Sequence, residues 1–181
     1  ENGFLVATDA HKLIKIKQSG IDKQGIFDPK TGAEYEGKYP NYDAVIPEDN
    51  PIKVEISIKE LRPKLEGMER ANRFFATDPT ILARIRIGDS EYLFAPKLLN
   101  DILKVLEQHG HDKVTIELST PTRALLIKEG DITALVMPIY SSSQDEVRRK
   151  STIIDRDFTE AEQIAQDGFE RKVQINNIKR E

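Results

Sequence analysis

The side chains with the most reactive chemistry lie in two short segments. Thr8, Asp9 and His11 lie close together near one end of the chain, and His109 and His111 are separated by one glycine. Asp9 and His11, two residues apart on a strand, share a face, but no third partner for a hydrolytic triad is evident. Two histidines with neither cysteine nor a clear carboxylate geometry are usually solvent-exposed. We therefore expect no catalytic site, no metal site and no cofactor.

The composition excludes several other function classes. The chain has 181 residues and no cysteine, which excludes disulfides, cysteine-ligated zinc and thiol catalysis. It contains neither a Walker loop nor a dinucleotide-binding fingerprint. No apolar run could span a bilayer, and no signal peptide is visible. We expect a cytoplasmic protein that does not bind membranes, and an enzyme site hidden from sequence analysis is the least favoured interpretation.

The charge distribution bears on nucleic-acid binding. The formal net charge is −4, whereas nucleic-acid binders are usually basic. A protein that surrounds DNA, however, needs basic residues only on its inner wall, and an acidic exterior limits non-specific binding. Two polar stripes at helical spacing could contact phosphates without reading bases. They comprise Lys59 and Arg62, and Lys97, Asn100, Lys104 and Gln108. The alternative is an ordinary solvated helix face.

Two helices must position these stripes. Ser57 and Glu60 form a capping-box pattern at the start of the first helix, and Pro63 predicts a kink or an early end. Its apolar face comprises Ile58, Leu61, Leu65 and Met68. The second helix is expected to begin near Pro96 and to end near Gly110. Its apolar face comprises Leu98, Leu99, Ile102, Leu103 and Leu106, which we expect to pack on the strand over 132–139.

Alternating apolar and polar residues predict the strands. They are expected over 4–8, 11–17, 52–56, 81–87, 91–94, 113–118, 123–128 and 132–139. Residues 19–37 are expected to form a long loop or an extended hairpin, and residues 39–47 an extended connector with a proline near each end. From residue 141 the sequence is charged and poor in core residues, which favours a flexible tail or a helix over 157–173.

Four segments, in order, resemble one family. The sequence LVATDAHKL at 5–13 resembles the VATDGHRL motif of the bacterial β sliding clamp, the processivity subunit of DNA polymerase III. Residues 39–47 resemble its FPDY…V-P connector, residues 94–103 the start of its last helix, and residues 134–139 its C-terminal VVMPM. The resemblance implies an α+β, DNA-clamp-like fold with helices packed on antiparallel β-sheets.

The spacing of these motifs implies a shortened and divergent member. Only residues 14–38 separate the first two segments, too few for the half-domain that lies there in the family. Ala10 stands where the family has Gly, and Lys12 where it has Arg. We expect three parts: a strand pair, loop and connector over 1–47, a clamp-like domain over 48–140, and a charged tail, flexible or helical, over 141–181.

The resemblance also implies a peptide-binding groove. In the family these motifs meet at a domain junction and take up a short linear motif of polymerases and repair factors. The matching residues are Thr8, Ala10, His11, Lys12, Leu13, Pro40, Val45, Leu135, Met137, Pro138 and Ile139. Methionine and leucine would give an adaptable apolar floor. The alternative is that these are simply core and edge residues of adjoining strands.

The resulting hypothesis is a sliding-clamp-like processivity factor of DNA replication. It would bind duplex DNA non-specifically through the two polar stripes and tether a polymerase or another replication protein through the groove. Such a protein could act as a homo-oligomeric ring. The alternative is a clamp-derived adaptor that keeps the peptide groove and does not encircle DNA. Neither would be an enzyme.

Overall fold

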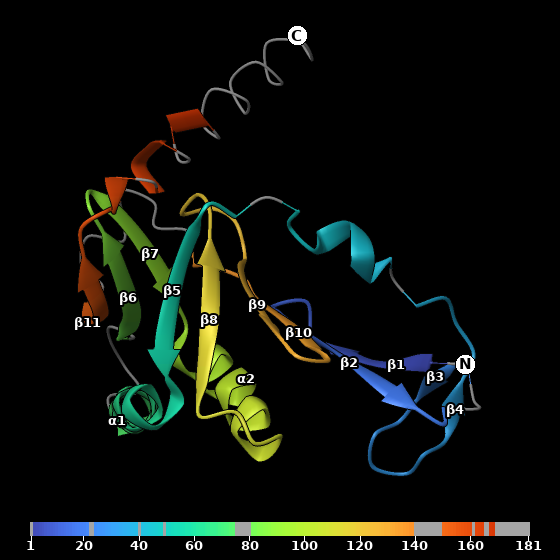
Figure 1. Cartoon of the computed structure of the whole chain (residues 1–181). Coiled ribbons are helices and arrows are strands. Elements are labelled where there is room, and N and C mark those ends of the chain that lie inside the picture. Colours follow the sequence, from blue (N-terminus) through green and yellow to red (C-terminus); the bar gives the residue numbers. More distant parts are fainter. Residues whose placement is uncertain are drawn as a thin grey trace, which may run out of the picture.

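A computed structural model describes residues 2–21, 24–39, 41–48, 50–74, 81–139, 150–160, 162–164 and 167–168 (Figure 1). Their elements are β1 (Asn2–Thr8), β2 (Lys12–Ser19), β3 (Ile26–Phe27), β4 (Glu34–Tyr35), the 3₁₀ helix η1 (Tyr42–Val45), β5 (Ile52–Ser57), α1 (Ile58–Phe74), β6 (Leu82–Ile87), β7 (Ser90–Phe94), α2 (Pro96–Gln108), β8 (Lys113–Leu118), β9 (Leu125–Glu129), β10 (Ile132–Val136) and β11 (Lys150–Arg156). The short β3–β4 hairpin agrees with the expectation of a hairpin within residues 19–37.

Most strands form one antiparallel sheet of six, in the order β1-β2-β10-β9-β8-β5. The pairing of β2 with β10, in which Leu13 lies opposite Leu135, joins the first hairpin to strands more than a hundred residues away. A smaller sheet has the order β11-β6-β7. Figure 1 shows β1 and β2 extending the large sheet well beyond the two helices.

The main core lies between the sheets and the two helices, which lie side by side. From α2 the buried residues include Leu99, Ile102, Leu103 and Leu106, while Leu98 is half-buried against the same core. Ile132, Ala134 and Val136 of β10 belong to this core too. The expected packing of the second helix on the last strand of the sheet is therefore confirmed, although that strand ends at Val136 rather than at residue 139.

Helix α1 continues through Pro63 to Phe74, so the expectation of an early end is wrong. Proline lacks an N–H and so removes one backbone hydrogen bond near the start of the helix. The apolar face beyond it stays buried through Leu65 and Met68, and this burial holds the helix together. At its start, the Glu60 N–H donates to Ser57 Oγ at 3.3 Å, as the capping pattern predicted.

The connector is not extended throughout, because it contains η1. The Ile46 N–H donates to the Asp43 carbonyl at 3.3 Å, which closes the turn. The prolines near its ends disfavour an α-helix but allow this single turn. The turn lets Tyr42 and Ile46 pack on the same small apolar cluster of the sheet.

Residues 150–156 were expected to belong to a charged tail and instead form β11, which pairs in parallel with β6. Ile153 is buried in the core, and Asp155 accepts two hydrogen bonds from Arg86 at 2.8 and 3.0 Å. Beyond β11, hydrogen bonds from Arg156 lower the pKa of Glu162 to about 2. Residues 160, 162–164 and 167–168 are helical, and the rest of the helix expected over 157–173, apart from 157–159, lies outside the described residues.

Truncating Ile102 to alanine tests the core assignment. Ile102 is 3% exposed on the central apolar face of α2, so the change should lower the free energy of unfolding by about 2–5 kcal/mol. The measurement is urea unfolding followed by circular dichroism. Lys104→Ala, an exposed position on the same helix, serves as control and should shift the midpoint little. Equal midpoints for Ile102→Ala and the parent would remove Ile102 from the core.

Candidate functional site

A second apolar cluster lies on the sheet face away from the helices. Its buried members are Leu13, Ala124, Leu126 and Leu135, with Val6, Tyr42 and Ile46 packed against them. Neighbouring strand residues point to opposite faces, and Ile14 and Ile16 pack on the main core, so Leu13 faces the other way. We call these seven residues the strand-face cluster. Here the first hairpin, the connector and the last strand of the sheet meet.

The turn between β1 and β2 is shaped by two side chains. Asp9 Oδ1 accepts hydrogen bonds from the N–H groups of His11 at 3.0 Å and Lys12 at 2.9 Å. Thr8 Oγ1 donates to the Lys12 carbonyl at 2.8 Å and accepts from the Ala10 N–H at 3.2 Å. These bonds hold Ala10 at a φ of +70°, a left-handed conformation that favours glycine.

The turn is also joined to the segment that follows β10. The Met137 N–H donates to the His11 carbonyl at 2.8 Å, so these two predicted groove residues lie side by side. The Met137 side chain is exposed to solvent, at 42%. Ile139 instead donates its N–H to the Leu93 carbonyl of β7 at 2.7 Å, which directs the chain away from the turn.

Lys15 fixes the connector against the hairpin. Its ammonium group lies 4.3 Å from the centre of the Phe4 ring and 4.9 Å from that of Tyr42, and it pairs with Asp43 at 2.9 Å. Tyr39 adds a hydrogen bond from its hydroxyl to the Val6 carbonyl at 3.2 Å. Cation–π and charge interactions thus hold η1 over the strand-face cluster.

The described groove residues that were predicted differ in exposure to solvent. Leu13 and Leu135 were expected to line an open groove, but they are only 4% and 3% exposed beneath Val6, Tyr42 and Ile46. The exposed residues are Thr8, Ala10, His11, Val45 and Met137, and the half-buried ones are Lys12, Pro138 and Ile139. Pro40 lies outside the described residues.

Five members of this cluster were not among the residues predicted from the sequence: Val6, Tyr42, Ile46, Ala124 and Leu126. Tyr42 and Ile46 are the apolar residues at either end of the 3₁₀ turn, and their spacing was the available signal. Leu126 lies opposite Leu135 in the register of β9 and β10. That pairing could be inferred only once the register was known.

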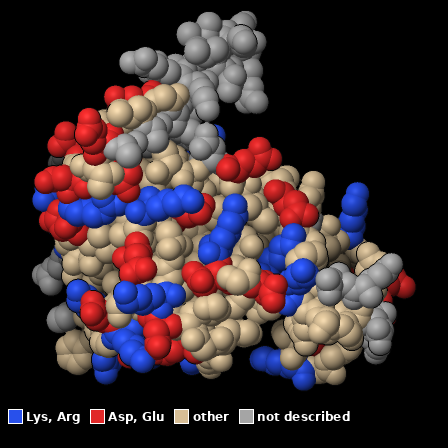
Figure 2. Space-filling model, viewed as in Figure 1, with Lys and Arg blue, Asp and Glu red and all other residues tan. Residues whose placement is uncertain are grey.

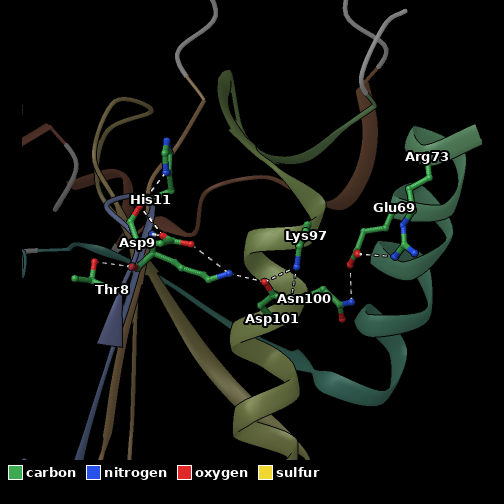
Figure 3. Close-up of polar contacts among 9 residues, drawn as sticks. Thr8, Asp9, His11, Glu69, Arg73, Lys97, Asn100 and Asp101 are labelled. Carbon is green, nitrogen blue, oxygen red and sulfur yellow. Dashed lines mark hydrogen bonds and ion pairs between the residues drawn. The ribbon is translucent and has the colours of Figure 1, made fainter. Parts of the chain in front are cut away.

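We call the two predicted polar stripes together the α1–α2 face: Lys59, Arg62, Lys97, Asn100, Lys104 and Gln108. Asn100 was predicted to contact DNA, but it is buried, at 8% exposure. Arg62 joins the helices, donating to Asn100 Oδ1 at 3.1 Å and pairing with Glu107. The Asn100 amide donates to Glu69 at 2.6 Å, as Figure 3 shows. On α2 the spacing of 97, 100, 104 and 108 places these side chains on one side of the helix.

Carboxylates neutralise several cations of this face. Lys59 pairs with Asp112 at 2.7 Å, Arg62 with Glu66 at 2.7 Å, and Lys97 with Asp101 at 2.9 Å. Lys104 and Gln108 are exposed to solvent. Figure 2 shows Lys and Arg interspersed with Asp and Glu over the side of the molecule in view.

Asp101 connects the α1–α2 face to the β1–β2 turn (Figure 3). Lys12 Nζ donates to its carboxylate at 2.5 Å, and the same ammonium group lies 3.5 Å from Asp9. Burial would raise the pKa of Asp101, but hydrogen bonds from Lys12 and Lys97 outweigh it and lower this pKa. Burial would likewise lower the pKa of Lys12, but the hydrogen bond and charge of Asp101 outweigh the burial, so the Lys12 pKa is raised.

Other chemistry finds little support in the part of the chain that the structure describes. No cluster of three or more His, Asp or Glu side chains there could hold a metal ion. His109 Nδ1 lies 2.8 Å from the Val105 carbonyl of its own helix. None of the described helices is both long and apolar enough to cross a membrane.

Comparison with solved structures places this arrangement among the DNA sliding clamps. The chain superposes on the DNA polymerase III subunit beta sliding clamp of Bartonella birtlesii with a TM-score of 0.61 and 18% identity, over 77% of this chain and 58% of that one. For the subunit of Pseudomonas aeruginosa the values are 0.58, 18%, 75% and 55%. For the beta chain of Streptococcus pneumoniae they are 0.56, 19%, 75% and 53%. The sequence matches no family model and no curated protein.

The fold is therefore that of the DNA polymerase III beta sliding clamps. The chain spans a little more than half the length of these three proteins. The predicted α+β, clamp-like fold class is confirmed.

Replacing Ala10 by glycine tests the strain in the turn. A residue with a Cβ atom pays about 1–2 kcal/mol to adopt this left-handed φ, and glycine avoids this strain. Glycine also has more conformational freedom in the unfolded chain, which cancels about 0.5–1 kcal/mol of that gain. Ala10→Gly should therefore raise the free energy of unfolding by about 0.5–1 kcal/mol, measured by urea unfolding. Ala7→Gly, in the extended β1, is the control and should lower it. If both variants lose stability alike, the turn is not strained at Ala10.

Proposed function

We propose that this protein is a clamp-like tether for DNA replication that has no catalytic chemistry. It binds duplex DNA without sequence preference through the α1–α2 face. It captures a short apolar motif of a polymerase or another replication protein beside the β1–β2 turn. The observation that supports this function best is the meeting of the first hairpin, the connector and β10 at one apolar cluster, with the Met137 N–H bonded to the His11 carbonyl of the turn beside it.

The exposed side chains of Met137 and Val45 give a partner its first apolar contacts. They lie on segments that border the strand-face cluster, and His11 lies exposed beside Met137. Short peptides commonly dock at such junctions and gain most of their affinity from one or two anchoring side chains. Because Tyr42 and Ile46 cover Leu13 and Leu135, deeper insertion requires that these two side chains move aside.

The charge of the two helices supports DNA binding. Within a chain of net charge −4, α1 and α2 together have seven Lys and Arg residues against five Asp and Glu. Lysine and arginine on such a face position a duplex through its phosphates and read no bases. Binding of this kind weakens steeply as salt rises, because counterions are released when phosphates are neutralised.

A second candidate is the adaptor that keeps peptide capture and does not encircle DNA. The pairing of Lys59, Arg62 and Lys97 with carboxylates favours it, since each pair must open before a phosphate can bind. A strongly salt-dependent DNA affinity would separate the tether from the adaptor. Light scattering would add the assembly state, which differs between a ring and a free adaptor.

Met137→Ala tests peptide capture. Loss of an exposed anchor should weaken binding of a clamp-binding peptide from a replicative polymerase by about fivefold or more and leave the unfolding midpoint unchanged. Fluorescence anisotropy measures the affinity. Leu5→Ala is the matched control, since Leu5 is 51% exposed and lies on the other face of the sheet. Leu13→Ala is unsuitable because burial makes it a folding variant. Equal binding by all three proteins would remove Met137 from the site.

Charge reversal of Lys97 and Lys104 together tests DNA binding. The double change to glutamate should weaken binding of unrelated duplexes to the same extent and flatten the dependence of affinity on salt. The measurement is anisotropy with labelled duplexes at several salt concentrations. Lys17→Glu with Lys128→Glu changes the charge equally on the opposite sheet face and serves as control. Equal losses in the two double variants would mean that net charge, not this face, governs DNA binding.

A further inference from the structure

One carboxylate holds a lysine from each of the two proposed binding surfaces. Asp101 accepts a hydrogen bond from Lys12 at 2.5 Å and from Lys97 at 2.9 Å. Lys12 is the first residue of β2, directly after the β1–β2 turn beside the peptide surface, and Lys97 belongs to the α1–α2 face. The side chain of Asp101 is 33% exposed, so its charge is shared between two cations in a partly desolvated place.

The two lysines differ in how easily they leave Asp101. The Lys97 side chain is 68% exposed, whereas that of Lys12 is 24% exposed and is flanked by Asp9 as well. A solvent-exposed ion pair contributes only about 0.2–1 kcal/mol, so a phosphate can replace Asp101 as the partner of Lys97 at a small cost in free energy. Lys12 has no such freedom, because it is held between two carboxylates.

We propose that Asp101 is a positioning residue that links DNA binding at the α1–α2 face to peptide capture at the β1–β2 turn. When a phosphate engages Lys97, Asp101 is left with Lys12 as its partner and holds it more firmly. The Lys12 backbone N–H and that of His11 both donate to Asp9, so a firmer Lys12 steadies the whole turn. The turn joins Met137 through the His11 carbonyl, and the peptide surface becomes better ordered.

The linkage rests on the proposed function and is reciprocal. If bound DNA raises the affinity for the peptide by some factor, bound peptide raises the affinity for DNA by the same factor. Since the pair that opens is a surface pair, the expected factor is about two- to fivefold. The device makes the protein a better tether when it is on DNA than when it is free.

The first experiment needs no ligand. Amide hydrogen exchange at His11 and Lys12 reports directly on the turn. Exchange should be faster in Asp101→Asn, which releases Lys12, and slower in Lys97→Gln, which leaves Asp101 to Lys12. Glu91→Gln is the matched control, because Glu91 is 31% exposed and also holds two cations, Arg84 and Lys150, away from both surfaces. Exchange that is the same in all four proteins would overturn the positioning role.

The second experiment titrates the polymerase peptide into each protein with and without a saturating duplex oligonucleotide. The duplex should tighten the peptide about two- to fivefold in the parent and in Glu91→Gln, and leave it unchanged in Asp101→Asn and Lys97→Gln. The linkage is overturned if DNA raises the peptide affinity of Asp101→Asn as much as that of the parent. It is also overturned if each ligand binds the parent alone but DNA leaves the peptide affinity of the parent unchanged. Absence of binding to either ligand alone overturns the proposed function itself, and the linkage with it.

Discussion

The antiparallel pairing of β2 with β10 is the contact on which the rest of the structure depends. It joins a hairpin at one end of the chain to a strand more than a hundred residues later and so makes one sheet of six strands. One face of that sheet packs on α1 and α2, and the other carries the strand-face cluster. Because side chains alternate along a strand, a shift of one residue in this register would exchange the two faces. Leu13 would then face the helices, and Ile14 and Ile16 would face the connector.

The same pairing explains why the candidate site lies where it does. The β1–β2 turn and the segment after β10 leave the sheet at the same end, so His11 and Met137 become neighbours. Asp9 and Thr8 hold the turn in shape through side-chain hydrogen bonds, at the cost of a left-handed Ala10. Lys15 then holds the connector across the strands. The site is thus made by local polar contacts placed on a rigid sheet.

Electrostatics gives the molecule a balanced rather than a uniformly basic surface. Cations that could meet phosphates are already matched with carboxylates on the same or the neighbouring helix. Such matching limits non-specific attraction and weakens any contact with DNA, because each pair must be exchanged for a phosphate. Asp101 connects these charge pairs to the β1–β2 turn, because its carboxylate pairs with both Lys97 and Lys12.

The sequence by itself determined both helices and all six strands of the large sheet, because burial on one side leaves a clear apolar period along the chain. It also determined the clamp-like fold class, through four short motifs. Only the tertiary structure decided that Leu13 and Leu135 are covered, since Tyr42 and Ile46 reach them from a connector that the sequence suggested was extended. It also revealed β11, whose pairing with β6 depends on contacts such as Arg86 with Asp155, 69 residues apart. Long-range pairing leaves no local period in a sequence, so these features required the fold.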